Sequence, residues 1–134
     1  MEKELKRDRT CTYNIGYHLV WSTKYRKPVI KGAIETALKK IFNEVAREKV
    51  FEIKYIEVMP DHVHVFVSAQ PKVAPSYIYK MLKGISARRL FLKFPKLQRQ
   101  LWGGHLWNPS TYIETVGHVS ENVVKRYIEE QKSK

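Results

Sequence analysis

Cysteine, glycine, proline and acidic residues are all few in this chain of 134 residues, and each shortage argues against a kind of site, segment or partner. The single cysteine, Cys11, excludes a disulfide framework and a zinc site built from cysteine pairs. No stretch has the composition of a linker or a low-complexity segment. No apolar run is long enough to span a membrane, and the charged N-terminus has no signal-peptide core. We therefore expect one soluble, cytoplasmic domain with no membrane partner.

The acidic residues do not balance the basic ones. Lysine and arginine number 25 against 13 acids, a formal net charge of +12. Such a field on a small domain favours a polyanion, either nucleic acid or an anionic membrane. The alternative is a solubilising surface of the kind common in thermophiles, but such surfaces usually gain lysine and glutamate together, and here the acids lag behind. We expect nucleic acid to be the partner.

Hydrophobic periodicity predicts alternating strands and helices across a single domain of residues 1–134, with residues 1–10 as a flexible arm. We expect strands over 11–25, 51–59, the stretch that follows the Met59–Asp61 turn, and 111–116; helices over 31–49, 75–94 and from about Ser120 to the end; and a loop over 95–110. The order β-α-β-β-α-β is typical of the α+β, ferredoxin-like plan, an antiparallel sheet with two helices on one face, here followed by a C-terminal helix.

The stretch Met59–Ala69 (MPDHVHVFVSA) contains the most informative pair of residues. Side chains alternate along a strand, so His62 and His64 are expected on one face while the intervening valines point into a core. Two imidazoles on one rigid face can chelate a metal ion. Packing or hydrogen bonding is the commoner role for such a pair, so the pair alone does not establish a metal site.

Tyr127 and Gln131 are four residues apart in the expected C-terminal helix and would share one face. Gln131 offers a carbonyl oxygen for a hard cation, and Tyr127 a phenol oxygen that is nucleophilic once deprotonated. Tyr127 could instead extend the apolar stripe of Val119 and Val123. Combined with the histidines, these residues would support phosphodiester transesterification, in which a covalent phosphotyrosine conserves the bond energy for rejoining.

His62-Val63-His64 also matches the HUH motif, and with Tyr127 the chain resembles the single-tyrosine HUH transposases of insertion sequences, including relatives associated with REP elements. The resemblance covers nearly the whole chain. The supporting stretches are 20–26 (VWSTKYR), 86–91 (SARRLF), 106–112 (LWNPSTY) and 114–119 (ETVGHV).

The resemblance implies a DNA transposase that works as a metal-dependent single-strand endonuclease and strand transferase. It implies a homodimer, Mg²⁺ or Mn²⁺, a 5′-phosphotyrosine intermediate, and single-stranded DNA hairpins at element ends as the substrate. Carried over by position, His62, His64 and Gln131 become metal ligands, Tyr127 the nucleophile and Gly117 a hinge.

Several further residues are candidates for DNA contact or support of the site. Asp61 could orient His62, or could simply form the turn after Pro60. For each phosphate-binding candidate the alternative is a solvated helix face, and for the tryptophans it is core packing. The candidates for DNA binding are Arg26, Lys80, Lys83, Arg88, Arg89 and Trp102, with Trp107 and Tyr112 as further possible stacking surfaces.

Three other functions stay open on the sequence. A domesticated HUH endonuclease would carry the same motifs and differ in its genomic surroundings. A nucleic-acid-binding module without catalysis would use the tyrosine and histidines for packing. A zinc hydrolase is the third, but no further His, Asp or Glu has convincing ligand spacing. His105 and His118 are expected in capping or surface roles.

Overall fold

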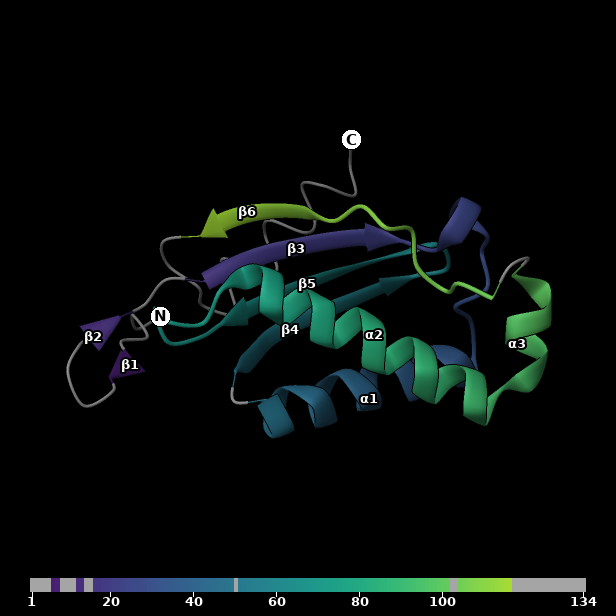
Figure 1. Cartoon of the computed structure of the whole chain (residues 1–134), viewed down its shortest axis with the longest axis horizontal. Helices are drawn as coiled ribbons and strands as arrows, with labels where there is room; N and C mark the ends of the chain where they lie inside the picture. Colours follow the sequence, from purple (N-terminus) through teal and green to yellow (C-terminus); the bar gives the residue numbers. More distant parts are fainter. Residues whose placement is uncertain (1–5, 8–11, 14–15, 50, 102–103, 117–134) are drawn as a thin grey trace.

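An antiparallel sheet with helices packed on one face forms the molecule (Figure 1). The computed structural model describes residues 6–7, 12–13, 16–49, 51–101 and 104–116. Its elements are β1 (Lys6–Arg7), β2 (Thr12–Tyr13), β3 (Gly16–Ser22), η1 (Lys24–Arg26), α1 (Ala33–Lys49), β4 (Glu52–Met59), β5 (His62–Ser68), α2 (Pro75–Lys93), α3 (Pro95–Gln100) and β6 (Tyr112–Val116). In this part of the chain, neither long helix has the length and apolarity needed to cross a bilayer.

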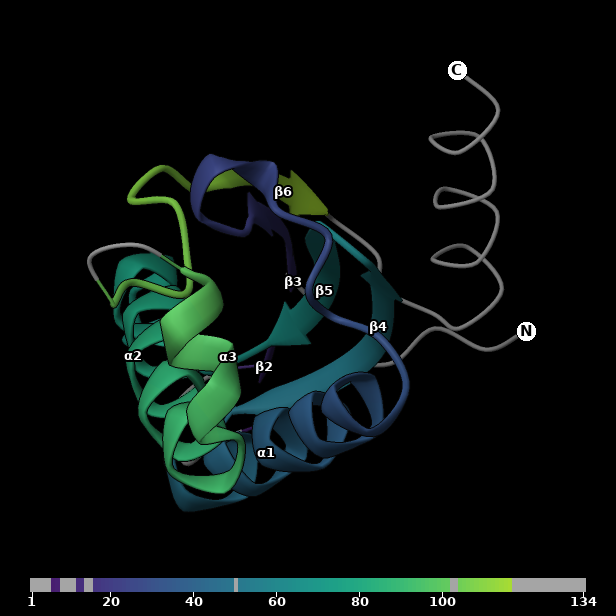
Figure 2. The ribbon, with the colours of Figure 1, turned by 90° about the vertical axis from the view of Figure 1, so that its right-hand side faces the viewer.

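The four long strands lie in the order β4-β5-β3-β6, and every neighbouring pair is antiparallel. The view along the sheet in Figure 2 shows α1, α2 and α3 on the same face. This α+β arrangement confirms the predicted β-α-β-β-α-β order. The expected C-terminal helix lies outside the described residues.

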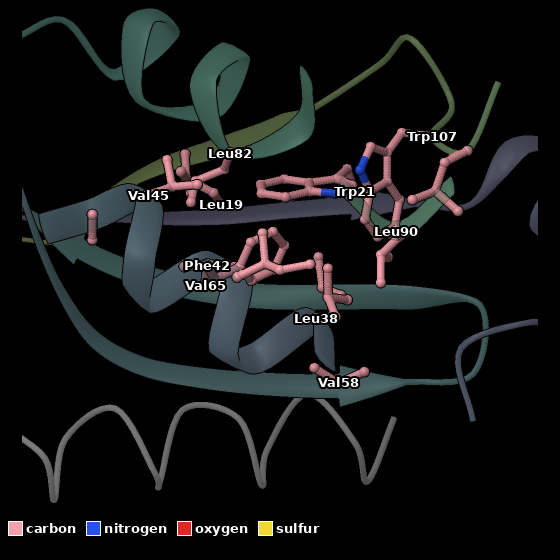
Figure 3. Packing of buried hydrophobic residues seen from close by; sticks show 14 of the residues in the cluster. Leu19, Trp21, Leu38, Phe42, Val45, Val58, Val65, Leu82, Leu90 and Trp107 are labelled. Carbon is pink, nitrogen blue, oxygen red and sulfur yellow. The ribbon is translucent and has the colours of Figure 1, made fainter. Parts of the chain in front are cut away.

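The core forms between the helices and the valine face of the sheet (Figure 3). Leu19 of β3 is in register with Val65 of β5, and Trp21 with Val63. Trp21 meets Phe42 of α1 edge to face, with ring centroids 5.9 Å apart. All of these side chains are almost completely buried, and the alternation of β5 predicts this burial for Val63 and Val65.

The first strand and the loop over 95–110 differ from the prediction. β3 ends at Ser22 rather than near Tyr25, and Thr12–Tyr13 of the expected strand pair with Lys6–Arg7 of the expected flexible arm in a separate two-stranded sheet. The expected loop contains a short helix, α3, which begins at Pro95 and buries Leu97. Proline suits the first turn of a helix, where its missing N–H is not needed, so it starts this helix as Pro75 starts α2.

The hairpin between β4 and β5 places the histidines. Met59 pairs with His62 across the Pro60–Asp61 turn, as predicted. From that register, the odd-numbered valines of β5 face the helices, while His62 and His64 lie on the opposite face. The fold therefore holds the two imidazoles on the sheet face that α1 and α2 leave uncovered.

Truncation of the core ring should destabilise the domain strongly. Because Phe42 is fully buried against Trp21, we expect Phe42→Ala to lower the free energy of unfolding by about 3–5 kcal/mol. Leu92 is 77% exposed, so Leu92→Ala should change it by less than about 0.5 kcal/mol. Urea denaturation of the two variants measures both values, and equal losses would contradict the described core.

Candidate functional site

The two histidines of β5 line an open cavity on the sheet face opposite α1 and α2. Its volume is about 910 Å³, enough for a nucleotide-sized ligand. The imidazole centroids of His62 and His64 are 5.2 Å apart, with the ring planes at 71°. Arg26, Ser110 and Tyr112 also line the cavity. The structure therefore brings the predicted histidine pair together with Arg26, a predicted DNA-binding residue, and Tyr112, a predicted stacking surface.

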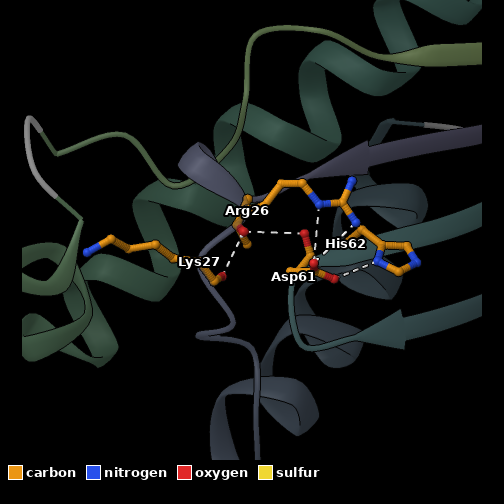
Figure 4. A network of polar contacts seen from close by, with 5 residues as sticks. Arg26, Lys27, Asp61 and His62 are labelled. Atoms are coloured by element: carbon orange, nitrogen blue, oxygen red, sulfur yellow. Dashed lines mark hydrogen bonds and ion pairs between the residues drawn. The ribbon is translucent and has the colours of Figure 1, made fainter.

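Asp61 orients His62 (Figure 4). Its Oδ1 lies 2.7 Å from His62 Nδ1, so the carboxylate accepts a hydrogen bond from the ring. Its Oδ2 accepts from Arg26, at 3.2 Å from Nη2 and 3.3 Å from Nε. The hydrogen bond from His62 lowers the pKa of the Asp61 carboxyl most, and the charge of Arg26 acts in the same direction against the opposing effect of burial. The carboxylate is thus ionised and turned toward His62.

The backbone around Arg26 is unusual. Tyr25 and Arg26 have φ angles of 58° and 52°, the left-handed region that costs a side chain roughly 1–2 kcal/mol. Buried Thr23 holds the segment, because its Oγ1 donates to Lys27 O at 2.7 Å and its backbone N–H to Asp61 O at 2.9 Å. This strained turn ends β3 and carries the guanidinium to Asp61.

A third histidine, His18, which the sequence motif does not include, lies next to His64. His18 of β3 is fully buried, and its Nε2 lies 2.9 Å from Nδ1 of His64. On its other side, Nδ1 lies 3.6 Å from Oε1 of Glu114, the residue opposite it on β6. Burial lowers the pKa of His18, while the Glu114 carboxylate raises it; their 3.6 Å contact is an ion-pair distance and is longer than a hydrogen bond. The strict alternation of residues 16–22 put His18 on one face, but only the strand register shows which partners it meets.

Lys83, predicted to bind phosphate, instead supports the cavity wall from the helical side. Its Nζ donates to the carbonyl oxygen of Asn108 at 2.8 Å and to Thr111 Oγ1 at 2.9 Å, with the carbonyl oxygens of Pro109 and Ser110 at 3.4 and 3.3 Å. Burial lowers the pKa of this ammonium group. The oxygen acceptors offset the cost of burying it and fix the loop that carries Ser110 into the cavity.

The other predicted phosphate-binding residues of α2 lie apart from the histidines. Lys80, Arg88 and Arg89 line a groove between α1 and α2. These two helices lie on the other side of the sheet from the histidines (Figure 2). Arg89 is paired there with Glu44 and Glu48 of α1.

The aromatic residues that were candidates for base stacking also differ in where they lie. Trp107 is buried and donates to Ser86 Oγ at 3.0 Å, so it packs in the core and is not a stacking surface for DNA. Tyr112 is exposed at the cavity. Four further predicted residues, Trp102, Gly117, Tyr127 and Gln131, lie outside the described residues.

The described residues fit part of a metal site. Within the ranges that the structure describes, no three His, Cys, Asp or Glu side chains converge to hold an ion. Two imidazoles are present, each with Nδ1 engaged by a protein partner. A histidine that binds metal usually has its other ring nitrogen engaged in this way, so the pair fits a divalent cation that takes its remaining ligands from elsewhere.

Comparisons with known proteins agree on one family. The family model described as "Transposase IS200 like" matches residues 11–131. The ISDra2 transposase TnpA of Deinococcus radiodurans is 44% identical over 131 residues, which cover 98% of this chain and 94% of the relative. An IS200 transposase of Salmonella typhimurium is 29% identical, with coverage of 98% and 86%.

Two solved structures share the fold. A transposase from Deinococcus radiodurans superposes with a TM-score of 0.79 at 41% identity, covering 94% of this chain and 97% of that one. A REP-associated tyrosine transposase bound to a REP hairpin gives a TM-score of 0.60 at 14% identity, covering 91% and 67%. At that identity the second likeness concerns the fold alone.

Replacement of Lys83 should loosen the cavity wall. Because Lys83→Met leaves the oxygens of 108–111 without their donor, we expect a loss of about 1–3 kcal/mol in the free energy of unfolding and faster amide exchange in that loop. Lys80→Met removes the same charge from an exposed position on the same helix and should do neither. Urea denaturation and hydrogen exchange compare the variants, and identical behaviour would refute the role of Lys83.

The Asp61 contacts should make stability depend on acid pH. A carboxyl whose pKa is depressed in the folded state contributes stability that is complete above its unfolded pKa, near 3.8, and is lost as the pH falls through the folded value. The difference in unfolding free energy between the wild type and Asp61→Asn should therefore be constant near neutral pH and shrink in acid below 3.8. Denaturation at a series of pH values tests this, and a pH-independent difference would contradict it.

Proposed function

Because the chain belongs to the family of IS200-like transposases, we propose that it cleaves and rejoins single-stranded DNA at its histidine site, as a metal-dependent HUH endonuclease and strand transferase. One observation carries this proposal. Two imidazoles, each with its Nδ1 engaged, lie at a cavity that an arginine also lines, in a chain of net charge +12. A metal-assisted reaction on a polyanion needs those elements.

His62 and His64 would hold the cation, with Gln131 as the third protein ligand. Mg²⁺ and Mn²⁺ are the candidates, and Mn²⁺ should bind more tightly, since imidazole nitrogen is a poorer ligand for the harder Mg²⁺. When bound, the cation would withdraw charge from a non-bridging phosphate oxygen and stabilise the transition state of displacement. Asp61 keeps the proton of His62 on Nδ1, so Nε2 carries the lone pair that a ligand needs.

Tyr127 would be the nucleophile. Its phenol loses a proton and its oxygen attacks phosphorus, the bond from phosphorus to the 3′-oxygen breaks, and that oxygen takes up a proton to leave as a 3′-hydroxyl. The phosphate stays joined to the 5′-oxygen, as a 5′-phosphotyrosine. Attack of a 3′-hydroxyl on this ester reverses the step and rejoins a strand without ATP.

The DNA would be a hairpin at the end of a mobile element. A relative in fold is bound to a REP hairpin, and the charge of this chain suits a similar ligand. Arg26 lines the cavity and would meet a phosphate there, while Trp102 would stack on a base and Lys80, Arg88 and Arg89 would meet more distant phosphates. We propose a homodimer in which Gly117, with glycine's wide range of φ, lets the segment carrying Tyr127 change position.

A covalent adduct tests the nucleophile. The wild type, incubated with Mn²⁺ and a labelled single-stranded hairpin from the flanks of its gene, should give a protein–DNA adduct that survives denaturation. Tyr127→Phe lacks only the phenol oxygen and should give none, a loss of at least 10²-fold, while still shifting the hairpin in a binding assay. Tyr77→Phe is the matched control, because Tyr77 is a half-exposed tyrosine of α2 away from the cavity.

The other outcomes identify the alternatives. Adduct with Tyr127→Phe would refute that residue as nucleophile. Hairpin binding without adduct in the wild type, with either metal, would indicate a binding module. His64→Ala and chelation of the metal should each abolish the adduct, and an adduct that survives both would refute the metal site.

A further inference from the structure

A polar row lies beside the site, and neither His18, which is buried, nor Glu114, which is partly exposed, would touch the metal or the DNA in the proposed reaction. The row runs across three neighbouring strands, from Glu114 on β6 through His18 on β3 to His64 on β5. His18 is fully buried, and burying a polar imidazole costs free energy unless a hydrogen bond offsets that cost, so packing alone does not account for a histidine at this position.

The two imidazoles meet edge to edge. Their planes differ by 13°, and the centroid separation of 5.2 Å is close to the 2.9 Å between Nε2 of His18 and Nδ1 of His64 plus the two ring radii. An imidazole N–H and an imidazole lone pair both lie in the ring plane. Near-coplanar rings in line are therefore the geometry of a strong N–H···N hydrogen bond.

Neighbouring aromatic rings fix the plane of His18. Phe66 lies parallel to it at 4.3 Å with an interplanar angle of 7°, and Tyr112 presents an edge at 6.4 Å and 78°. Ring rotation would break these contacts together with the hydrogen bond. His18 is thus held with Nε2 toward His64 and Nδ1 toward Glu114.

The carboxylate decides the direction of the hydrogen bond. A neutral imidazole has one N–H and one lone pair. If His18 carried its proton on Nε2, it would donate to His64 and turn the lone pair of Nδ1 toward the Glu114 carboxylate 3.6 Å away, an unfavourable meeting of two acceptors at a buried atom. With the proton on Nδ1, His18 faces the carboxylate with an N–H, and its Nε2 must accept from Nδ1–H of His64.

We propose that Glu114 and His18 are positioning residues that keep the proton of His64 on Nδ1, so that its Nε2 presents a lone pair as a metal ligand. Both histidines of the motif would then be oriented by a carboxylate, His62 directly by Asp61 and His64 through His18. The tautomer of His64 is independent of any metal, whereas its use as a ligand rests on the proposed function.

Nitrogen NMR of the full-length, metal-free protein tests the tautomer directly. Long-range ¹H–¹⁵N correlations of histidines labelled with ¹⁵N distinguish protonated from unprotonated ring nitrogens. We expect neutral His18 and His64 to be protonated on Nδ1. A His64 ring protonated on Nε2 would overturn the proposal, because that nitrogen would have no lone pair for a metal.

Variants of His18 separate a hydrogen-bonding role from packing. His18→Leu removes the acceptor, so His64 should become a mixture of tautomers and Mn²⁺ affinity, by calorimetry, should fall about 10- to 100-fold. His18→Gln can place its carbonyl oxygen near the position of Nε2, so it should keep the Nδ1–H tautomer and most of the affinity. Equal affinity and equal spectra in His18→Leu and the wild type would refute the proposal.

Glu114→Gln decides the matter if the buried position tolerates no change. The Glu114 side chain is 37% exposed on an edge strand, so its neutral isostere should fold. It should lower the Nδ1–H population of His64 and weaken Mn²⁺ binding, whereas Glu52→Gln, the same charge change on β4, should alter neither. A Glu114→Gln protein with wild-type spectra would exclude the carboxylate from the proposed relay, the chain of contacts from Glu114 through His18 to His64.

The two proposals fail in different ways. If His64 holds its proton on Nδ1 and loses that preference in His18→Leu, the relay stands even if the protein binds no Mn²⁺ and forms no adduct with DNA. If the adduct forms and depends on metal but the tautomer is unaffected by either variant, the function stands and the relay is wrong.

Discussion

The alternation of β5 is the constraint on which the structure depends. A strand cannot present valine to the helices without presenting the intervening residues to the other face, so burial of Val63 and Val65 determines where His62 and His64 lie. A slip of one residue in the pairing with β3 would put imidazoles into the core and valines at the cavity. The hydrophobic free energy of the helical layer therefore holds the register that the histidines need.

The parts that follow from local pattern could be predicted from the sequence. The β4–β5 hairpin, the facing of the two histidines and the helix ending at Lys49 each depend on residues close together in the chain, where periodicity reports burial directly. The sheet order follows from the sequence of elements. The loop predicted after Pro95 is a local prediction that was wrong. A proline can end one helix or start the next, and only the burial of Leu97 shows that Pro95 starts α3.

The parts that depend on distant pairing could not be predicted. His18 is 46 residues from His64, and only the register of three strands places it between that ring and Glu114. Nothing in the sequence distinguishes Lys83 from Lys80 as a candidate for phosphate contact. Its position on α2 directs it to the loop after Trp107, while Lys80 faces solvent. Charge alone predicted phosphate contact for both, and the structure shows that one of them is used internally.

Under the proposed function, the placement of the carboxylates would favour the binding of a phosphate. A carboxylate that ligated a divalent cation directly would neutralise part of its charge and weaken its attraction for a phosphate. At this site Asp61 and Glu114 lie behind imidazoles, one bound to His62 and the other facing His18. Neutral imidazole and amide ligands would not lower the net charge of a divalent cation. Asp61, in contact with His62, and Glu114, which reaches His64 through His18, would raise the basicity of the ligand rings. The arrangement suits an enzyme that must attract a polyanion and also hold the metal that acts on it.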